Sequence, residues 1–358
     1  MSAAAASPEV VAYRTRDLEI LAASLADWLQ ARMPAARDIR ILDLSYPLGA
    51  GMSHETILFD AEWREDGAPR KRGLVVRIKP QGELVYHDDM FEEQYRLMKL
   101  MHEASDVKVA EPLWFEPDPS LLGAPFFVME KKAGKVAVSY PPYSKAGWLV
   151  DSATPADRRV MWEDTVTQLA LIQRVAVPDF LAQPGQPTGF AQESDRWKRY
   201  TDWIDPKGEL TLLRQGYDRL MAACPANRPE GIVWGDARLG NMMIGADFKV
   251  AAVMDWEQPS QGGALHDLGW WLLSERNYTV HQGIPPLDGM GSRDETIALW
   301  EKVSGKSAEG IEWYEAFVVY KQECLGTNMA RTRDMSAKAA SWEPGTRIKA
   351  ALDALGIA

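Results

Sequence analysis

The sequence has 358 residues, which at about 150 residues per domain suggests roughly two domains, and its 46% hydrophobic and 25% charged residues are those of a globular chain rather than a disordered one. Its 40 Lys and Arg against 51 Asp and Glu give a net charge of −11, which disfavours nucleic acids and anionic membranes as partners because both are polyanions. The sequence has no apolar run of 18 residues, so no transmembrane helix is expected. Its N-terminus does not look like a secretory signal, and its two cysteines cannot form a disulfide framework. The sequence therefore predicts a reduced, cytoplasmic protein.

One helix is predicted to precede a strand-rich first third. Leu18, Leu21, Leu25 and Leu29 fall on one face of a helix over 15–33. Strands are expected at 41–48 and 55–63, on the two sides of the segment LGAGMSHET, then at 73–79 and at 125–130.

Two segments of this part carry a clear periodic signal. In GLVVRIK, residues 73–79, one face of the predicted strand is apolar and the other carries the charged residues; the first face holds Leu74, Val76 and Ile78, and the second holds Val75, Arg77 and Lys79. A helix is predicted over 89–102, where Asp89 and Glu92 stand at the spacing of a capping box.

From about residue 132 the pattern becomes helical. Thr154 is a cap residue followed by proline and by Asp157 in the first turn, which predicts a helix from there to about Val175. Further helices are expected over 196–222 and over most of 265–355, whereas 231–255 reads as a strand, a loop and a hairpin. The sequence therefore predicts an α+β protein with a domain at 1–132 and a mainly helical domain at 133–358.

The segment 232–257, IVWGDARLGNMMIGADFKVAAVMDWE, carries the chemistry. Asp236 and Asn241 are five residues apart in a polar loop, a hairpin is predicted around Gly245-Ala246-Asp247, and Asp255 follows it at once. Phosphoryl transfer needs a carboxylate that orients and deprotonates the attacking hydroxyl, and oxygen ligands that hold Mg²⁺ against a triphosphate. Asp and Asn in such a loop are more often ordinary turn residues, but the spacing, the hairpin and the upstream glycine-containing segment together favour the catalytic interpretation.

This segment resembles the catalytic and metal-binding loops of the aminoglycoside phosphotransferase/choline kinase superfamily. The similarity runs from about residue 40 to 280 and looks closest to the branch that includes the kinase domains associated with acyl-CoA dehydrogenases. It implies a protein-kinase-like fold, with a small β-rich N-terminal lobe and a larger, mainly helical C-terminal lobe. It also implies ATP- and Mg²⁺-dependent transfer of a phosphoryl group to the hydroxyl of a small molecule, with GTP in place of ATP left open.

The resemblance also implies roles for individual residues of the second lobe. Asp236 would be the catalytic base, and Asn241 and Asp255 would be the magnesium ligands. Arg238 would lie between base and metal, near the charge that develops on the transferred phosphoryl group. Asp267, in HDLGWW, looks like the aspartate that supports the catalytic loop.

For the first lobe the resemblance implies the nucleotide contacts. LGAGMSHET looks like the loop over the phosphates, in which Gly49 and Gly51 allow close backbone approach and Ser53 could donate to a phosphate oxygen. Arg77 stands where kinases carry the strand lysine, with Lys79 as the alternative. VMEKK looks like the hinge between the lobes, whose backbone around Glu130 would bind adenine.

Two positions depart from the family pattern. Trp234 stands where the catalytic loop commonly begins with histidine, and Gln94 stands where the helix over 89–102 would carry the glutamate partner of Arg77, so that Glu93 or another acid could take that part. A tryptophan can fill the volume and donate one hydrogen bond. These departures prompt the alternative of a catalytically weak or inactive nucleotide-binding regulator with the same fold.

The charge balance of the helical domain restricts which class of acceptor molecule the protein could bind. Residues 133–230 hold 12 Lys and Arg against 12 Asp and Glu, and 258–358 hold 10 against 13, which weakens an aminoglycoside assignment because polycations require an acidic site. A less charged, partly apolar hydroxylated small molecule fits better. The five histidines are widely scattered, are expected at the surface or at caps, and predict no metal triad.

Overall fold

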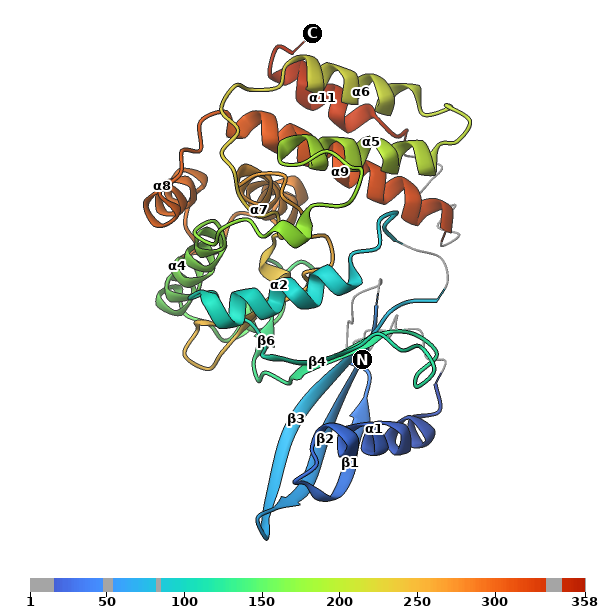
Figure 1. Ribbon diagram of the computed structural model, residues 1–358. Coiled ribbons are helices and arrows are strands. Elements are labelled where there is room, and N and C mark those ends of the chain that lie inside the picture. The colour runs from blue at the N-terminus through green and yellow to red at the C-terminus, as the bar shows by residue number, and fades with distance from the viewer. Residues whose placement is uncertain (1–15, 48–53, 82–84, 333–342, 358) are drawn as a thin grey trace, which may run out of the picture. The chain divides into compact units, whose positions relative to one another are not determined.

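The computed structural model describes residues 16–47, 54–81, 85–332 and 343–357. The chain forms two compact units (Figure 1), a strand-rich unit of residues 1–84 and 110–132 and a helical unit of residues 85–109 and 133–358. The class is α+β, as predicted.

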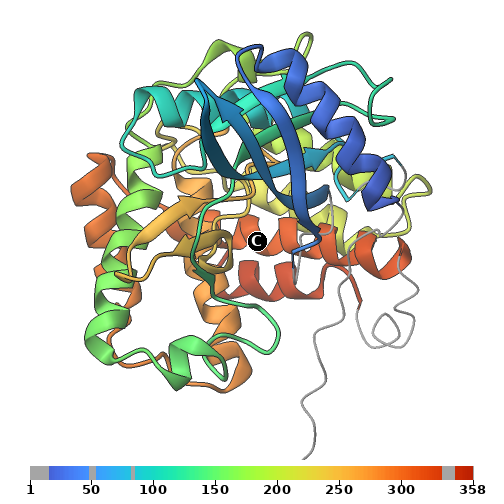
Figure 2. The same ribbon diagram turned by 90° about the horizontal axis from the view of Figure 1, so that it is seen from below.

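The strand-rich unit is an antiparallel sheet of five strands in the order β1-β2-β3-β5-β4, with α1 packed on β1. Figure 2 shows α1 lying along the strands. The elements are α1 (Leu18–Arg32), β1 (Arg37–Ser45), β2 (Glu55–Glu65), β3 (Ala68–Ile78), β4 (Pro112–Glu116) and β5 (Phe126–Glu130). The predicted helix and strands are present, but β4 was not predicted. Strand β3 begins five residues earlier than predicted. Its first half is polar and largely exposed, so the apolar pattern did not reveal it.

A two-residue turn sets the register of β2 and β3. Glu65 pairs with Ala68, and Asp66 and Gly67 between them have φ of 52° and 77°. Positive φ at both positions is the backbone of a type I′ turn, which matches the twist of a hairpin and favours Asp-Gly.

The core of this unit lies between α1 and one face of the sheet. Trp28 of α1 contacts Trp114 edge to face at 5.9 Å and Phe126 at 4.9 Å, and its Nε1 donates to Glu116 Oε2 at 2.9 Å. The indole thus buries apolar surface while its one polar atom keeps a partner. The same core holds Leu21, Leu25, Leu29, Ile57, Phe59, Leu74, Val76, Ile78 and Val128.

The helical unit contains a small antiparallel sheet in the order β6-β7-β8, surrounded by helices. The strands are β6 (Lys135–Val136), β7 (Met242–Ile244) and β8 (Val250–Val253). The α-helices are α2 (Phe91–Ala104), α3 (Trp148–Asp151), α4 (Pro155–Ile172), α5 (Phe190–Ile204), α6 (Thr211–Ala222), α7 (Leu265–Tyr278), α8 (Arg293–Ser304), α9 (Ile311–Thr332) and α11 (Thr346–Ala354). Short 3-10 helices η1 (Asp179–Leu181), η2 (Leu239–Asn241) and η3 (Val280–Gln282) join some of them.

Helix α9 is the centre of the packing, in contact with α5, α6, α7 and α11, and the group is visible in Figure 1. Helix α4 packs on α8 and on β8. These contacts place the β7–β8 hairpin and α7, both of which follow the Asp236 loop in sequence, on a well-packed support.

Three local predictions are wrong, each for a physical reason. The helix predicted over 196–222 is two helices, because Pro206 lacks an amide hydrogen and Gly208 has φ of 71°, and Asp205 caps the break. Asp89 and Glu92 do not form a capping box, since α2 begins at Phe91 with Met90 as its N-cap. The strand predicted at the start of 231–255 is a single bridge between Val233 and Ser260.

Two other predictions for this unit are confirmed. Thr154 caps α4 in a complete capping box with Asp157, and the hairpin of β7 and β8 is present. In the described part of the chain, no helix is long and apolar enough to cross a membrane.

Candidate active site

The loop between Val233 and β7 gathers three of the predicted site residues. Oδ2 of Asp236 accepts hydrogen bonds from Nδ2 of Asn241 at 2.7 Å and from Nε of Arg238 at 2.9 Å. Asn241 Nδ2 also donates to the Asp236 carbonyl at 3.0 Å, and the Asn241 amide donates to the Arg238 carbonyl at 2.9 Å. The structure therefore brings these three side chains together around one carboxylate.

The Arg238 side chain is anchored on its other side. Its Nη1 donates to Ser139 Oγ at 2.9 Å, and the Tyr278 hydroxyl donates to the same oxygen at 3.1 Å. Burial alone would lower the pKa of Arg238, but the Asp236 carboxylate outweighs it and holds that pKa above its ordinary value. A permanent positive charge therefore lies beside Asp236.

Asp267, near the start of α7, holds the backbone at the beginning of the loop. Its Oδ2 accepts from the amide of Trp234 at 2.6 Å and its Oδ1 from the amide of Gly235 at 2.9 Å. Gly235 has φ of 108°, and a Cβ there would lie 2.7 Å from the Gln258 carbonyl oxygen, so only glycine fits. Burial raises the pKa of Asp267 to about 7, although the two amides oppose the shift.

The indole of Trp234, the residue at the family's histidine position, joins the loop to the segment after β8. Its Nε1 donates to the carbonyls of Met254 at 2.9 Å and Asp255 at 3.2 Å. The side chain is fully buried and its ring lies 5.8 Å from that of Trp256. The tryptophan thus supplies both the volume and the hydrogen bond expected of it.

Asp255 is placed next to Asn241 by a backbone bond. The amide of Met254, one residue earlier, donates to the Asn241 carbonyl at 2.8 Å. Asp255 itself has φ of 63°, a left-handed conformation that aspartate tolerates better than most residues and that occurs often at functional sites. The two predicted magnesium ligands therefore come from adjoining segments.

Two further polar residues near this loop were not predicted. Burial raises the pKa of the Tyr86 hydroxyl well above its ordinary value, and the carboxylates of Glu257, Asp236 and Asp255 add to the effect, which places the phenol within electrostatic range of all three. Glu257, two residues after Asp255, could have been suspected from that spacing. Nothing in the local sequence marks Tyr86, because its neighbours here are far from it in the chain.

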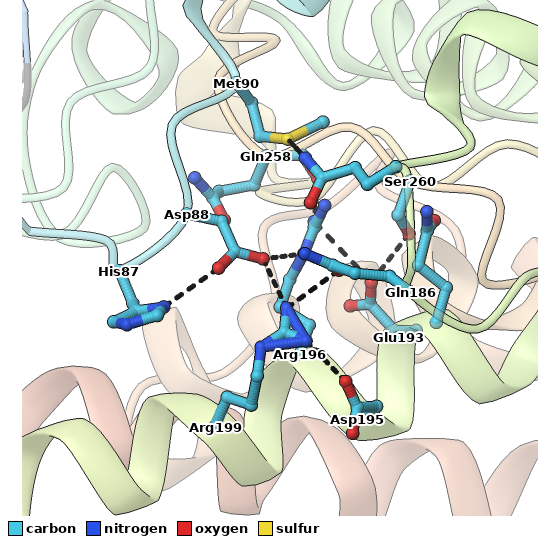
Figure 3. A network of polar contacts seen from close by, with 12 residues as sticks. His87, Asp88, Met90, Gln186, Glu193, Asp195, Arg196, Arg199, Gln258 and Ser260 are labelled. Carbon is cyan, nitrogen blue, oxygen red and sulfur yellow. Dashed lines mark hydrogen bonds and ion pairs between the residues drawn. The ribbon is translucent and has the colours of Figure 1, made fainter.

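Figure 3 shows a polar network that braces the segment after Asp255. Arg196 of α5 donates through Nη2 to the Pro259 carbonyl at 3.0 Å and through Nη1 to the Gln258 carbonyl at 3.3 Å. Its Nε lies 3.4 Å from Asp88 Oδ2, which also accepts from Arg199 Nη2 at 2.8 Å. Arg196 therefore ties together α5, the residues before α2 and the chain that follows Asp255.

A buried ion pair completes the network. Glu193 accepts from Lys321 Nζ at 2.6 Å and from Ser260 Oγ at 2.6 Å. Burial alone would raise the pKa of Glu193, but the Lys321 ammonium and the Arg196 guanidinium outweigh it and leave that pKa below its usual range. His266 lies 3.2 Å from Lys321 and is buried, which corrects the expectation that all five histidines are at the surface or at caps.

In the strand-rich unit, Arg77 and Glu130 are described, whereas Gly49, Gly51 and Ser53 lie outside the described residues. Arg77 is buried on β3, and its Nη2 lies 3.2 Å from His54 Nδ1. The amide of Glu130 donates to the Glu111 carbonyl at 2.9 Å, so within this unit that amide is not available to a base. The predicted adenine contact around Glu130 stays a prediction that must use other backbone atoms.

The partner of Arg77 also stays a prediction. Gln94 of α2 is fully buried, and neither atom of its side-chain amide has a hydrogen-bond partner among the residues the structure describes. Burial raises the pKa of Glu93, its neighbour. The same part of the chain contains no group of three or more His, Cys, Asp and Glu that could hold a metal.

Residues 47–305, more than half of the chain, match the model of the family described as the phosphotransferase enzyme family. Human acyl-CoA dehydrogenase family member 11 is 25% identical over 255 residues, which cover 67% of this chain and 30% of that protein. The chain spans about a third of the length of the curated relatives it matches.

Solved structures show the same fold. A protein of Ralstonia eutropha assigned to the aminoglycoside phosphotransferases superposes with a TM-score of 0.64 at 22% identity, covering 94% of this chain and 95% of that one. The aminoglycoside phosphotransferase APH(2'')-IIia, solved as a complex with GDP and kanamycin, superposes with a TM-score of 0.55 at 14% identity, covering 90% of this chain and 98% of that one.

Proposed function

We propose a reaction for this chain from its membership of the phosphotransferase enzyme family, within the aminoglycoside phosphotransferase/choline kinase superfamily. In this reaction the terminal phosphoryl group of a nucleoside triphosphate, ATP in the first place, is transferred to a hydroxyl of a small molecule. The observation that carries this proposal is the environment of the Asp236 carboxylate. It accepts hydrogen bonds from Arg238 and Asn241, and Asp267 accepts a hydrogen bond from the backbone at the start of the same loop.

Asp236 is suited to act as the base. Both side-chain bonds that it accepts fall on Oδ2, and no described residue donates to Oδ1, which is therefore the oxygen left for an acceptor hydroxyl. In the proposed reaction the hydroxyl oxygen attacks the γ-phosphorus, the bond from that phosphorus to the leaving diphosphate breaks, and the hydroxyl proton passes to Asp236. In this proposal Arg238, which is charged and anchored to Ser139, stabilises the negative charge on the transferred group.

Asn241 and Asp255 fit a magnesium ion as a donor set. Asn241 uses its Nδ2 hydrogens on Asp236, so its Oδ1 is the atom it can offer to a cation. One amide oxygen and one carboxylate suffice, because Mg²⁺ takes few protein ligands and completes its shell with phosphates and water. When bound, Mg²⁺ neutralises the phosphate oxygens and helps to orient them.

On the donor side we propose that Arg77 contacts the phosphates, together with the 49–53 segment. The guanidinium of Arg77, which is buried on β3, would supply a positive charge and a planar set of donors to a phosphate oxygen.

The pairing of the acids on and next to α5 supports an acceptor of low charge. Each acid of α5, and the aspartate that caps its end, has a cation within 3.0 Å; the pairs are Glu193 with Lys321, Asp195 with Arg199, Asp202 with Lys198 and Arg214, and Asp205 with Arg214. Acids that are already neutralised attract a polycation only weakly. We therefore expect the acceptor to be a hydroxylated, partly apolar small molecule rather than a polyamine antibiotic.

The test is release of ADP from Mg²⁺-ATP in the presence of a panel of small alcohols, sugars and hydroxy acids. Asp236→Asn keeps the size of the side chain but removes the base, and we expect turnover to fall by about 10²–10⁴-fold. Asp218→Asn, the same change at an exposed position of α6, is the matched control and should keep wild-type turnover.

Calorimetric titration with Mg²⁺-ATP separates this function from that of a regulator. We expect wild type and Asp236→Asn to bind the nucleotide with similar affinity while only wild type turns over. If both proteins bind the nucleotide and neither releases ADP with any compound of a broad panel, the result would contradict the proposed enzyme activity and favour a nucleotide-binding regulator.

A further inference from the structure

Tyr278, in the last turn of α7, fixes the segment of residues 139–144 that follows β6. Its hydroxyl donates to Ser139 Oγ at 3.1 Å, and its ring lies 5.6 Å from that of Tyr143. Its backbone carbonyl accepts a hydrogen bond from Ser144 Oγ. Three residues of this segment therefore contact one residue of α7, and the Tyr278 hydroxyl holds the side chain of Ser139 in place.

Ser139 in turn holds the guanidinium of Arg238. Its Oγ accepts from Arg238 Nη1 at 2.9 Å, while Arg238 Nε donates to Asp236 Oδ2 at 2.9 Å. Because a guanidinium is planar and rigid, two nitrogens with fixed partners determine where the third nitrogen points. No described residue accepts a hydrogen bond from Nη2, so this nitrogen can donate to an oxygen of the transferred phosphoryl group.

Gly240 provides the space for this guanidinium. A Cβ at Gly240 would lie 2.4 Å from Arg238 Nη1, which is closer than such atoms approach, and 3.1 Å from the Ala137 carbonyl oxygen. The φ angle of Gly240 is not positive, so its backbone accepts alanine. Because the nearest atom is the end of a flexible side chain, Gly240→Ala would displace the guanidinium and leave the loop folded.

We propose that Tyr278 is a positioning residue for phosphoryl transfer, which acts through Ser139 to keep the Arg238 guanidinium directed at the transferred group. This role rests on the proposed function, in which Arg238 stabilises the charge that develops on that group. An arginine with two fixed partners does not have to be ordered as that charge develops, and such preorganisation raises kcat. Tyr278 itself needs no contact with nucleotide or acceptor, so its loss should act on kcat rather than on KM.

The position of Arg238 can be measured without turnover. In ¹H–¹⁵N NMR spectra of the arginine Nε–H groups of the full chain, its signal is the one that Arg238→Lys removes. The hydrogen bond to Asp236 should slow the exchange of this hydrogen with water. Tyr278→Phe frees Ser139, and Ser139→Ala removes the partner of Nη1, so exchange should be about fivefold faster in both variants, as expected for the loss of one ordinary hydrogen bond.

Tyr217→Phe is the matched control. Tyr217 of α6 is also half-buried, its hydroxyl donates to the Ser194 carbonyl at 3.0 Å, and its ring lies 5.5 Å from that of Tyr320. The same atom is thus removed from a tyrosine of another helix, and exchange of the Arg238 hydrogen should stay at the wild-type rate. Gly240→Ala, which deletes no hydrogen-bonding group, should speed exchange and keeps the test decisive if Tyr278→Phe folds poorly.

The kinetic experiment uses Mg²⁺-ATP with an acceptor from the panel described above. We expect kcat to fall about tenfold in Tyr278→Phe, with KM for Mg²⁺-ATP within about twofold of that of the wild type. Ser139→Ala should lower kcat by a similar factor, and the double variant should lose little more, because both changes remove the same support of Arg238. Tyr217→Phe should keep the wild-type kcat.

An unchanged exchange rate in folded Tyr278→Phe and Ser139→Ala would overturn the proposal. So would a wild-type kcat in Tyr278→Phe, or equal losses of kcat in Tyr278→Phe and Tyr217→Phe, since a merely structural role would then explain both. Faster exchange in Tyr278→Phe, together with no turnover of any acceptor by the wild type, would contradict the proposed function and support the part of Tyr278 in holding Arg238.

Discussion

Trp234 offers a sharp test of how the site is held together, because one atom of its side chain bridges two segments. Trp234→Phe keeps a buried aromatic ring but deletes the N–H that donates to the carbonyls of Met254 and Asp255. Leaving a buried carbonyl unsatisfied costs about 1–3 kcal/mol, and the space vacated by the smaller ring adds about 1 kcal/mol. We expect the free energy of unfolding to fall by about 2–4 kcal/mol, which corresponds to a decrease in Tm of roughly 5–12 °C for a unit of this size.

Trp256→Phe is the matched control. Trp256 is equally buried and its Nε1 donates to the Val253 carbonyl at 3.0 Å, so the same atoms are lost, but that bond stays within one segment. Thermal denaturation should show similar losses for the two variants. The rate of phosphoryl transfer should separate them, because only Trp234 ties the Asp236 loop to Asp255: kcat/KM should fall at least tenfold in Trp234→Phe and less than threefold in Trp256→Phe.

Equal activity losses in the two variants would refute this reasoning, since they would show that aromatic volume alone holds the site. Unchanged activity in Trp234→Phe at temperatures below its Tm would refute it as well. In that case the backbone bond from Met254 to Asn241 would be sufficient to position Asp255.

Other predictions follow from single contacts. Burial raises the pKa of Glu275, so the folded state binds its proton more tightly than the unfolded state does, and the free energy of unfolding falls as pH rises from about 4 to 7. Glutamine has no such proton to lose. In denaturant titrations across that range, the free energy of unfolding of Glu275→Gln should therefore rise by about 3 kcal/mol relative to that of the wild type. Arg196→Gln leaves buried acids and carbonyls without their cation and should lower the free energy of unfolding by about 3–5 kcal/mol, whereas Lys198→Gln, on the exposed side of the same helix, should cost less than about 1 kcal/mol. Asn241→Leu should reduce turnover at least 100-fold and raise the Mg²⁺ concentration at half-maximal rate, and chelation of Mg²⁺ should abolish turnover of the wild type; a variant with normal Mg²⁺ dependence would remove Asn241 from the proposed ligand set.

Local sequence signals predicted those parts of the fold that are decided within a few residues. The capping box at Thr154 needs only the next three positions, and the hairpin of β7 and β8 needs only a turn between two apolar runs. The break at Pro206 was also readable locally, and the prediction failed there because helical periodicity was given more weight than the Pro and Gly signals.

The contacts that support the site are of a different kind, because they join residues far apart in the chain. Arg196 and Pro259 are separated by 63 residues, and Asp267 and Trp234 by 33. A buried arginine or aspartate looks like any other charged residue until the fold supplies its partner, so only family resemblance pointed to Asp267 and nothing pointed to Arg196. The spacing of Asp236, Asn241 and Asp255 was visible because those residues lie within 20 positions of one another.

The bonds of Asn241 have a consequence for how this chain can vary. Its nitrogen is committed to the neighbouring acid, and on the proposed assignment its oxygen faces the cation. Aspartate would repel that acid, leucine would serve neither neighbour, and glutamine would reach too far by one methylene. No single replacement preserves both functions, so we expect a saturation library at position 241 to recover only asparagine at wild-type activity.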